Sequence, residues 1–416
     1  GLFFFSSAIA RGVLNMEGAK YTLAALSPSI FFVCVSSVLR GYFSGINKMR
    51  IMSLSQIIEQ VFKSALTILM VLAAVGQTPE IMSAVANFAT TLATVVGTIY
   101  LVIAYKFKAE RNFTPSNGEL KKSFVAVAKK ILMIAIPISL CSIIAAINRI
   151  IDTATVVRGI ESAFKNYIPA RIGAAATVNP TSAQLNAEAV RLAGILSKSD
   201  TLLNLPLALN TALATVLVPS ISKYSANKNT LAIRNQINSS FLVSIVMILP
   251  CAVGYIILAR PIYELIYPNA SLGFELLQFG AASLVFTAPN QTLTGALQGM
   301  GRVYVPAAAL AFGCVIKLIS NVLLIRIPEI NIYGAVIGSA LCQAAVFGVE
   351  FYCLSRALNG GISIKRFFIK PIICSIVLGA AAYFIYKAAY YATGLNIAAV
   401  AASIILSAII YGTTII

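Results

Sequence analysis

The sequence predicts an all-α integral membrane protein with two like-oriented helical lobes, and three observations support this fold class. Hydrophobic residues make up 59% of the 416 positions and charged residues only 11%, a composition typical of membrane proteins rather than soluble domains. Apolar stretches of about 20 residues, enough to cross a bilayer roughly 30 Å thick, recur along the chain. Residues 39–63 and 293–317 repeat one pattern, which indicates a duplicated half.

Eleven membrane spans are predicted, after a short apolar segment at residues 1–10. The spans lie at 21–44, 51–76, 79–105, 130–157, 200–221, 239–260, 272–294, 303–327, 331–356, 370–391 and 395–416. Because the chain starts at Gly1 within an apolar run, we expect the first helices of the natural protein to be missing. The segment 158–199 between two spans is expected to be a long external loop.

Lysine and arginine are distributed unevenly between alternate loops. The loops at 40–50, 106–130, 223–234, around Arg302 and at 356–370 hold 18 of them, whereas the opposite set holds ten. The positive-inside rule therefore places the first set in the cytoplasm. Membrane orientation explains the net charge of +18, so we do not expect a nucleic-acid partner.

The repeated segments share residues with special backbone or charge roles. Each has a Gly-xxx-Gly pair, Gly41/Gly45 and Gly295/Gly299, followed by a cation and by an apolar helix that ends in lysine. Small residues at this spacing let two membrane helices approach closely. Six predicted helices separate the equivalent points, and an even number preserves orientation, so we expect the two lobes to be parallel.

The predicted organisation has four parts. They are a partial first lobe, a basic cytoplasmic linker, a second lobe and two C-terminal helices. Their ranges are 1–106, 107–121, 122–357 and 366–416.

Charged side chains inside the spans are the candidate functional residues. A charge at the centre of a span costs roughly 2.5–3.5 kcal/mol on insertion scales, so it needs a partner, a wet cavity or a ligand. Lys63, Arg149 and Lys317 are cations of this kind. Glu59 lies four residues before Lys63 and Asp152 three residues after Arg149, which puts each pair on one helix face. Two intrahelical ion pairs that merely permit burial are the alternative to a binding role.

Lys317 has no acidic residue three or four positions away. We therefore expect a lone cation that faces a cavity, an anionic ligand or, by snorkelling, the membrane interface. Amide side chains in other spans strengthen the prediction of a cavity, because they must find hydrogen bonds within the protein. The predicted substrate-binding residues are Lys63, Arg149, Lys317, Asp152, Glu59 and Asn204.

Several kinds of chemistry are excluded by residue type. Histidine is absent, which removes the commonest general base and a common zinc ligand. The seven cysteines have no CxxC spacing and are expected to pack as small apolar residues. The sequence also has no GxxxxGK[ST] motif for nucleotide phosphates. We predict no catalytic residue, no metal site and no cofactor.

Residues 26–63, LSPSIFFVCVSSVLRGYFSGINKMRIMSLSQIIEQVFK, resemble the fourth and fifth helices of polysaccharide exporters of the stage V sporulation protein B type. That group belongs with MurJ-like lipid II flippases in the MOP superfamily. PISLCSIIAAINRIIDTATVV and LLNLPLALNTALATVLVPSISKY are similar to the family's seventh and eighth helices. The resemblance implies a MATE/MOP-type fold of two parallel six-helix lobes plus two C-terminal helices, with the first helices lying before this chain.

Functional arginines of MurJ-like flippases cluster in the first two helices and near the start of the eighth helix. Here the eighth-helix segment reads SKSDTLLNLP, with Asp200 and Thr201 but no arginine. The resemblance therefore does not transfer those arginines, and the intramembrane cations of this chain are the candidates in their place.

The resemblance implies a multi-pass flippase of the bacterial plasma membrane, and not an enzyme. Its substrate would be a polyprenyl-pyrophosphate-linked saccharide, such as a lipid II-like precursor, moved from the inner to the outer leaflet by alternating access. The expected partners are this lipid, the surrounding membrane lipids and a coupling cation or the membrane potential, and a monomer is expected.

Two other functions remain open at this point. A cation-coupled multidrug exporter of the MATE type should prefer carboxylates in its cavity. A membrane glycosyltransferase or polysaccharide polymerase would need acidic residues on loops near the lipid phosphate. Glu161, Glu188 and Asp200 are the candidates for that role.

Overall fold

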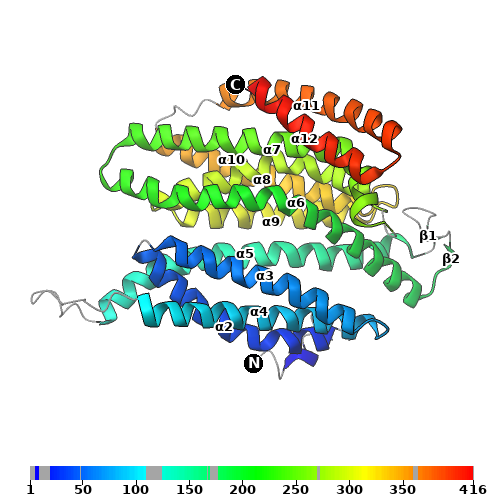
Figure 1. Ribbon diagram of the computed structural model, residues 1–416, viewed down its shortest axis with the longest axis horizontal. Coiled ribbons are helices and arrows are strands. Elements are labelled where there is room, and N and C mark those ends of the chain that lie inside the picture. The colour runs from blue at the N-terminus through cyan, green and yellow to red at the C-terminus, as the bar shows by residue number, and fades with distance from the viewer. Residues whose placement is uncertain are drawn as a thin grey trace, which may run out of the picture. The chain divides into compact units, whose positions relative to one another are not determined.

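The computed structural model describes eight stretches of the chain, and nearly all of their residues are helical (Figure 1). The described residues are 5–8, 19–46, 48–108, 124–165, 167–168, 177–268, 272–358 and 364–415. Within them, one long helix coincides with each of the eleven predicted spans, so the all-α membrane fold is confirmed. The predicted linker lies outside the described residues except for positions 107 and 108.

The chain forms two compact units, Gly1–Lys122 and Ser123–Ile416. The first unit contains α2 (Ala19–Gly45), α3 (Met49–Ala73) and α4 (Pro79–Lys108). Helix α4 packs along both α2 and α3, whereas α2 and α3 contact each other much less.

Hydroxyl groups on α4 help to hold this three-helix arrangement. Thr91 Oγ1 donates a hydrogen bond to the Ala25 carbonyl of α2 at 2.8 Å, and Thr98 Oγ1 donates to the Phe32 carbonyl at 3.2 Å. Such bonds satisfy polar groups that lipid cannot solvate.

The second unit contains the remaining helices and a two-stranded ladder. Its elements are α5 (Phe124–Ala163), β1 (Tyr167–Ile168), β2 (Thr177–Val178), α6 (Ser182–Ala226), α7 (Thr230–Ile266), α8 (Phe274–Gly299), α9 (Tyr304–Leu324), α10 (Tyr333–Ala357), α11 (Ile364–Thr393) and α12 (Asn396–Ile415). In Figure 1, α11 and α12 lie against α7, and the packing of these helices agrees.

The prediction of a long loop at 158–199 is wrong, because most of this segment is helical. Helices α5 and α6 extend into it from both sides, and β1 and β2 pair antiparallel between them. Thr181 begins α6 with a capping box: its hydroxyl accepts from the Gln184 backbone N–H, and the Gln184 side chain accepts from the Thr181 backbone N–H. Helices of 40 and 45 residues continue beyond the apolar stretches that were used to predict them.

Helix α8 differs from the other long helices. Ten of the eleven long helices in the described residues are long and apolar enough to cross a membrane, and α8 is the exception. It packs against α6, α7 and α10, and many of its side chains are buried. Because these neighbours shield α8 from lipid, it can carry polar side chains that a lipid-facing helix could not.

The second Gly-xxx-Gly pair brings α8 against α6. A Cβ atom on Gly295 would lie 2.9 Å from the Ala214 carbonyl oxygen, and one on Gly299 would lie 2.8 Å from the Val218 carbonyl oxygen. Only glycine permits this separation, so close helix approach is confirmed for this pair.

Candidate functional site

A cavity of about 600 Å³ lies among helices α5, α6, α8, α9 and α10 of the second unit. Helix α8 lines it with a polar stripe of side chains three or four positions apart, which places them on one helical face. The stripe consists of Ser283, Thr287, Asn290, Thr294 and Gln298. The polar side chains that distinguish α8 from the lipid-facing helices are thus concentrated at the cavity.

Four of the six predicted site residues line this cavity. Arg149 and Asp152 come from α5, Asn204 from α6 and Lys317 from α9. The structure therefore brings together residues that lie up to 168 positions apart in the chain. Their role in substrate binding stays a prediction.

Lys317 is paired, so the prediction of a lone cation is wrong. Its side chain is only 3% exposed, and its Nζ lies 2.5 Å from Asp152 Oδ2. Nζ also donates to the Asn148 carbonyl at 3.4 Å, and the other Asp152 oxygen accepts from Asn321 Nδ2 at 3.2 Å. The carboxylate partner comes from α5, a different helix. Residue spacing along α9 therefore could not predict this pair.

The same pairing corrects the expected Arg149–Asp152 ion pair, since Asp152 binds Lys317 instead. The Arg149 side chain is exposed and lines the cavity. A guanidinium in that position can reach an anion with its planar set of donors.

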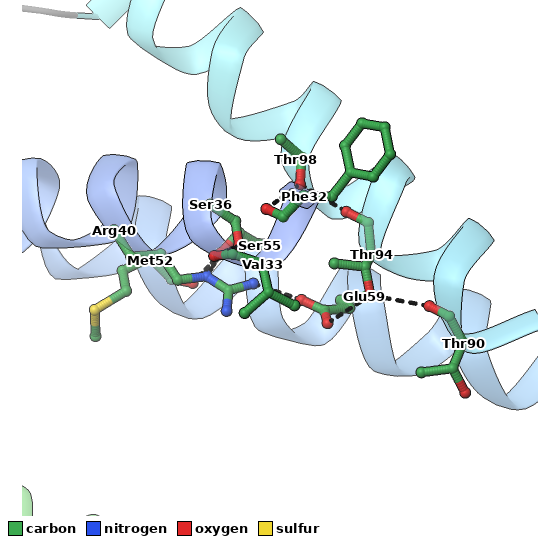
Figure 2. Close-up of polar contacts among 10 residues, drawn as sticks. All are labelled: Phe32, Val33, Ser36, Arg40, Met52, Ser55, Glu59, Thr90, Thr94 and Thr98. Carbon is green, nitrogen blue, oxygen red and sulfur yellow. Dashed lines mark hydrogen bonds and ion pairs between the residues drawn. The ribbon is translucent and has the colours of Figure 1, made fainter. Parts of the chain in front are cut away.

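Glu59 pairs with Arg40 of α2 and not with Lys63. Figure 2 shows the Arg40 guanidinium beside Glu59, with Nη2 2.6 Å from Oε2. Nε of Arg40 also donates to Ser55 Oγ at 3.1 Å. Arg40 belongs both to the predicted span 21–44 and to the basic loop at 40–50, and the structure places it on α2, which continues to Gly45. Lys63 lies further along α3, where its side chain is exposed.

A glycine on α4 lets the backbone approach this ion pair. A Cβ atom on Gly97 would lie 3.3 Å from Glu59 Cβ, and Thr94 Oγ1 reaches Glu59 Oε1 at 3.5 Å (Figure 2). Helices α2, α3 and α4 thus meet at one neutralised carboxylate.

Glu350 on α10 is a cavity residue that the sequence reasoning missed. It is 1% exposed, and its Oε1 accepts a hydrogen bond from Thr294 Oγ1 at 2.7 Å. The signal was present, because Glu350 lies inside the predicted span 331–356 and ionisable residues within spans mark functional sites. Unlike Glu59 and Asp152, Glu350 has no lysine or arginine three or four positions away along its helix.

Amide side chains connect the cavity helices. Asn290 Nδ2 of α8 donates to both the carbonyl and the side-chain oxygen of Gln343 on α10, each at 2.9 Å. Asn210 Nδ2 of α6 donates to Gln291 Oε1 and to the Ala288 carbonyl of α8, each at 2.8 Å. These bonds fix the wall between α6, α8 and α10.

The charged lining residues do not make this cavity cationic. Arg149 and Lys317 face three carboxylates, Asp152, Asp200 and Glu350. Two positive groups against three negative groups leave one formal negative charge in excess. The cavity lining of the second unit, taken alone, is therefore not predominantly cationic.

The acidic residues needed by a glycosyltransferase are engaged in structural contacts. Glu188 pairs with Arg191 at 2.7 Å, and Glu161 accepts from Asn186 at 3.4 Å. All of them lie on helices rather than loops. Asp200 belongs to the wall of the cavity.

Three curated proteins of Bacillus subtilis (strain 168) are similar to this chain. The uncharacterized membrane protein YabM is 26% identical over 352 residues, which cover 84% of this chain and 62% of YabM. The lipid II flippase MurJ is 24% identical, with coverages of 88% and 65%. Stage V sporulation protein B is 22% identical, with coverages of 91% and 70%. The chain thus spans less than two thirds of the length of the first two relatives.

Two solved structures share the fold. The lipid II flippase MurJ in an inward closed conformation matches with a TM-score of 0.66 and 15% identity, covering 99% of this chain and 78% of that one. An inward-facing MATE-family multidrug resistance transporter of the MOP superfamily matches with a TM-score of 0.61 and 15% identity, with coverages of 86% and 76%.

The family comparison confirms the resemblance suggested by the sequence. The model described as lipid II flippase MurJ matches residues 4–402, nearly the whole chain. Together with the ten apolar helices, this match identifies a multi-pass integral membrane protein of the bacterial membrane. The chain belongs to the lipid II flippase MurJ family.

Proposed function

We propose that the protein moves a polyprenyl-pyrophosphate-linked saccharide, of the lipid II type, from the cytoplasmic to the outer leaflet of the plasma membrane. The observation that carries this proposal is a polar cavity among membrane helices in a chain of the flippase family. An anionic, hydroxyl-rich headgroup cannot enter hydrocarbon without losing its hydrogen bonds. The cavity walls supply replacement groups, while the polyprenyl tail stays in lipid.

Arg149 is the proposed contact for the pyrophosphate. Arg149 is exposed and lines the cavity, and the donor fork of a guanidinium matches phosphate oxygens. Lys317 is a weaker candidate for direct binding, because its charge is balanced by Asp152 at 2.5 Å. We assign Lys317 and Asp152 to holding α5 against α9.

The hydroxyl and amide stripe of α8 is proposed to face the saccharide. Sugar hydroxyls both donate and accept hydrogen bonds, as do the threonine, asparagine and glutamine side chains along this wall. A volume of about 600 Å³ is within the usual range of small-molecule sites, roughly 300–1,000 Å³.

The membrane potential favours outward movement of this substrate. Each negative charge carried out of an inside-negative cell gains roughly 2.3 kcal/mol per 100 mV. A pyrophosphate carries about two such charges at neutral pH. Alternating access, driven by this potential or by a coupling cation, would expose the cavity to each side in turn.

A cation-coupled multidrug exporter is the second candidate function. The excess of carboxylates in the cavity and the fold shared with a MATE transporter favour it. An exporter of cationic drugs should depend on Asp200 and Glu350 and should lose little on neutralisation of Arg149. The flippase proposal predicts the reverse dependence on Arg149.

The decisive experiment measures flipping of labelled lipid II by the complete protein in vesicles. We expect Arg149→Gln to lower the initial rate by roughly ten- to a hundredfold, because a charge-assisted hydrogen bond of about 1.5–3 kcal/mol is lost. Arg149→Lys should recover only part of the rate, since it keeps the charge but not the fork.

The matched control is Arg260→Gln on α7. Arg260 forms an exposed pair with Glu264 at 2.9 Å, and it is not a lining residue of the cavity. Its rate should stay at the wild-type value. Wild-type flipping by Arg149→Gln would refute the phosphate contact. Efflux of a cationic dye without any lipid flipping would support the exporter in place of the flippase.

A further inference from the structure

We propose that one polar face of helix α3 is a binding surface for the anionic saccharide headgroup of the transported lipid. The inference rests on the proposed function and extends it to the first unit, taken by itself. The polar face consists of side chains that recur at helical spacing and are exposed or partly exposed. They are Ser53, Gln56, Gln60, Lys63, Ser64 and Thr67.

The polar face is distinct from the two other faces of α3. Ser55 and Glu59 are directed to α2 and α4, and Figure 2 shows them beside Arg40. Exposed apolar side chains make up a further face, which suits lipid. They are Leu54, Ile57, Val61, Ile68, Leu69 and Leu72. At roughly 100° per residue, the polar face lies apart from both of these sets.

Hydrocarbon cannot cover the polar face without a large penalty. Helix α3 is long and apolar enough to span the membrane. From Ser53 to Thr67 the face covers about 21 Å of a hydrocarbon core that is about 30 Å thick. Within the described residues, Gln56, Gln60 and Lys63 are exposed and make no hydrogen bond or ion pair. Since unpartnered amides and ammonium groups are costly in lipid, this face requires water or a polar ligand.

The internal repeat supports a ligand-facing role for this face. Helix α9 packs along α10 as α3 packs along α4. Leu310 and Lys317 of α9 line the cavity of the second unit, and the repeated segments align them with Gln56 and Lys63. The α3 face therefore corresponds to a helix face that already borders a polar cavity. It is also the more polar of the two at the first position, where glutamine replaces leucine.

The chemistry of the α3 face fits an anionic, hydroxyl-rich headgroup. Lys63 is its only charged member, whereas Lys317 is neutralised by Asp152 at 2.5 Å. An ammonium group binds phosphate oxygens as a point charge. Amide and hydroxyl side chains donate to and accept from sugar hydroxyls. The face thus offers one net positive charge, whereas the lining of the second-unit cavity has an excess negative charge.

The first test labels single cysteines in the complete protein, after the native cysteines are replaced and lipid II flipping in vesicles is verified. Gln60→Cys and Val61→Cys lie at the same depth, on the polar face and the apolar face respectively. A charged, membrane-impermeant methanethiosulfonate should label Gln60→Cys roughly tenfold faster or more, because apolar surroundings suppress the reactive thiolate. Excess lipid II should slow labelling of Gln60→Cys and leave that of Val61→Cys unchanged.

Equally slow labelling at the two positions would overturn the proposal, because it would show that lipid or another helix covers the polar face. Rapid labelling of Gln60→Cys without protection by lipid II would overturn it as well. That face would then be wet without binding the headgroup.

The second test keeps the native cysteines and measures flipping rates against lipid II concentration. Gln60→Leu should raise the half-saturating concentration by roughly 2–12-fold with little change in maximal rate, because a neutral hydrogen bond to the substrate is lost. Val61→Leu is the matched control and should behave as wild type. Unchanged half-saturation in both Gln60→Leu and Lys63→Gln would contradict this inference alone. Absence of flipping by the wild-type protein would instead refute the proposed function.

Discussion

Helices α2, α3 and α4 of the first unit and helices α8, α9 and α10 of the second unit are packed in the same order. In each set the third helix packs along both others, while the first two contact each other much less. The residue directly before the first glycine of the Gly-xxx-Gly pair binds a carboxylate in both sets, Arg40 to Glu59 and Thr294 to Glu350. The repeat seen in the sequence is therefore also a repeat of packing.

The two sets differ in how that carboxylate is neutralised. Arg40 brings a full positive charge to Glu59, whereas Thr294 brings only a hydroxyl to Glu350. The first arrangement is complete within its own three helices. The second leaves one carboxylate oxygen of Glu350 buried without a hydrogen-bond partner among the described residues. The carboxylates also come from different helices of their sets, since Glu59 lies on α3, the second helix, and Glu350 on α10, the third. Duplication has thus kept only the polar position before the glycine pair.

The glycine pairs and the repeated lysines of the two units also differ, because those of the second unit are in closer contact with their surroundings. Gly295 and Gly299 lie against the α6 backbone, whereas added Cβ atoms on Gly41 and Gly45 would meet no described atom within 4 Å. Lys317 is buried and paired, whereas Lys63 is exposed. Among the described residues, the members of these pairs in the second unit therefore contact a neighbouring helix, whereas Gly41 and Gly45 contact none.

The largest effect is expected when the two lysines are compared. Lys317→Met leaves Asp152 without its cation in a largely buried site and should reduce the free energy of unfolding by about 3 kcal/mol. Lys63→Met should change it by less than about 0.5 kcal/mol, because the side chain is exposed. Denaturant unfolding in detergent measures both values. Equal losses in the two variants would show that Lys63 also has a stabilising partner.

A second, smaller difference is expected for the same substitution in the two glycine pairs. Gly295→Ala places a Cβ atom 2.9 Å from a backbone oxygen and should destabilise by roughly 1–3 kcal/mol. Gly41→Ala lies in a helix with open space around it and should be neutral or stabilising by about 0.5–1 kcal/mol. The comparison uses the midpoint of thermal unfolding. A loss at Gly41 would indicate a neighbour outside the described residues.

The smallest effect concerns the neutralised carboxylate of the first unit. Arg40→Gln removes the cation from Glu59, but both side chains are about one-fifth exposed, so the expected loss is only about 1 kcal/mol. Adding Glu59→Gln should recover part of that loss, and the double-mutant cycle isolates the pair. No coupling between the two substitutions would mean that this ion pair contributes nothing to stability.

Much of the fold could be predicted from the sequence, because an apolar stretch of its own marks each membrane helix. All eleven predicted spans coincide with described helices, including the weakly apolar α8. The segment 158–199 was the main error. It lies at the ends of two helices that continue past their apolar stretches, where hydropathy no longer distinguishes helix from loop.

The sequence by itself determined the membrane class, the places of the long helices, the repeat and the family resemblance, since these depend on composition and local order. Only the tertiary structure decided which charges are neutralised. Spacing along one helix predicted Glu59 with Lys63 and Asp152 with Arg149, but the carboxylates bind Arg40 and Lys317 from other helices. A side chain in a membrane takes the partner that packing brings nearest, and for Lys317 that partner is 165 positions away.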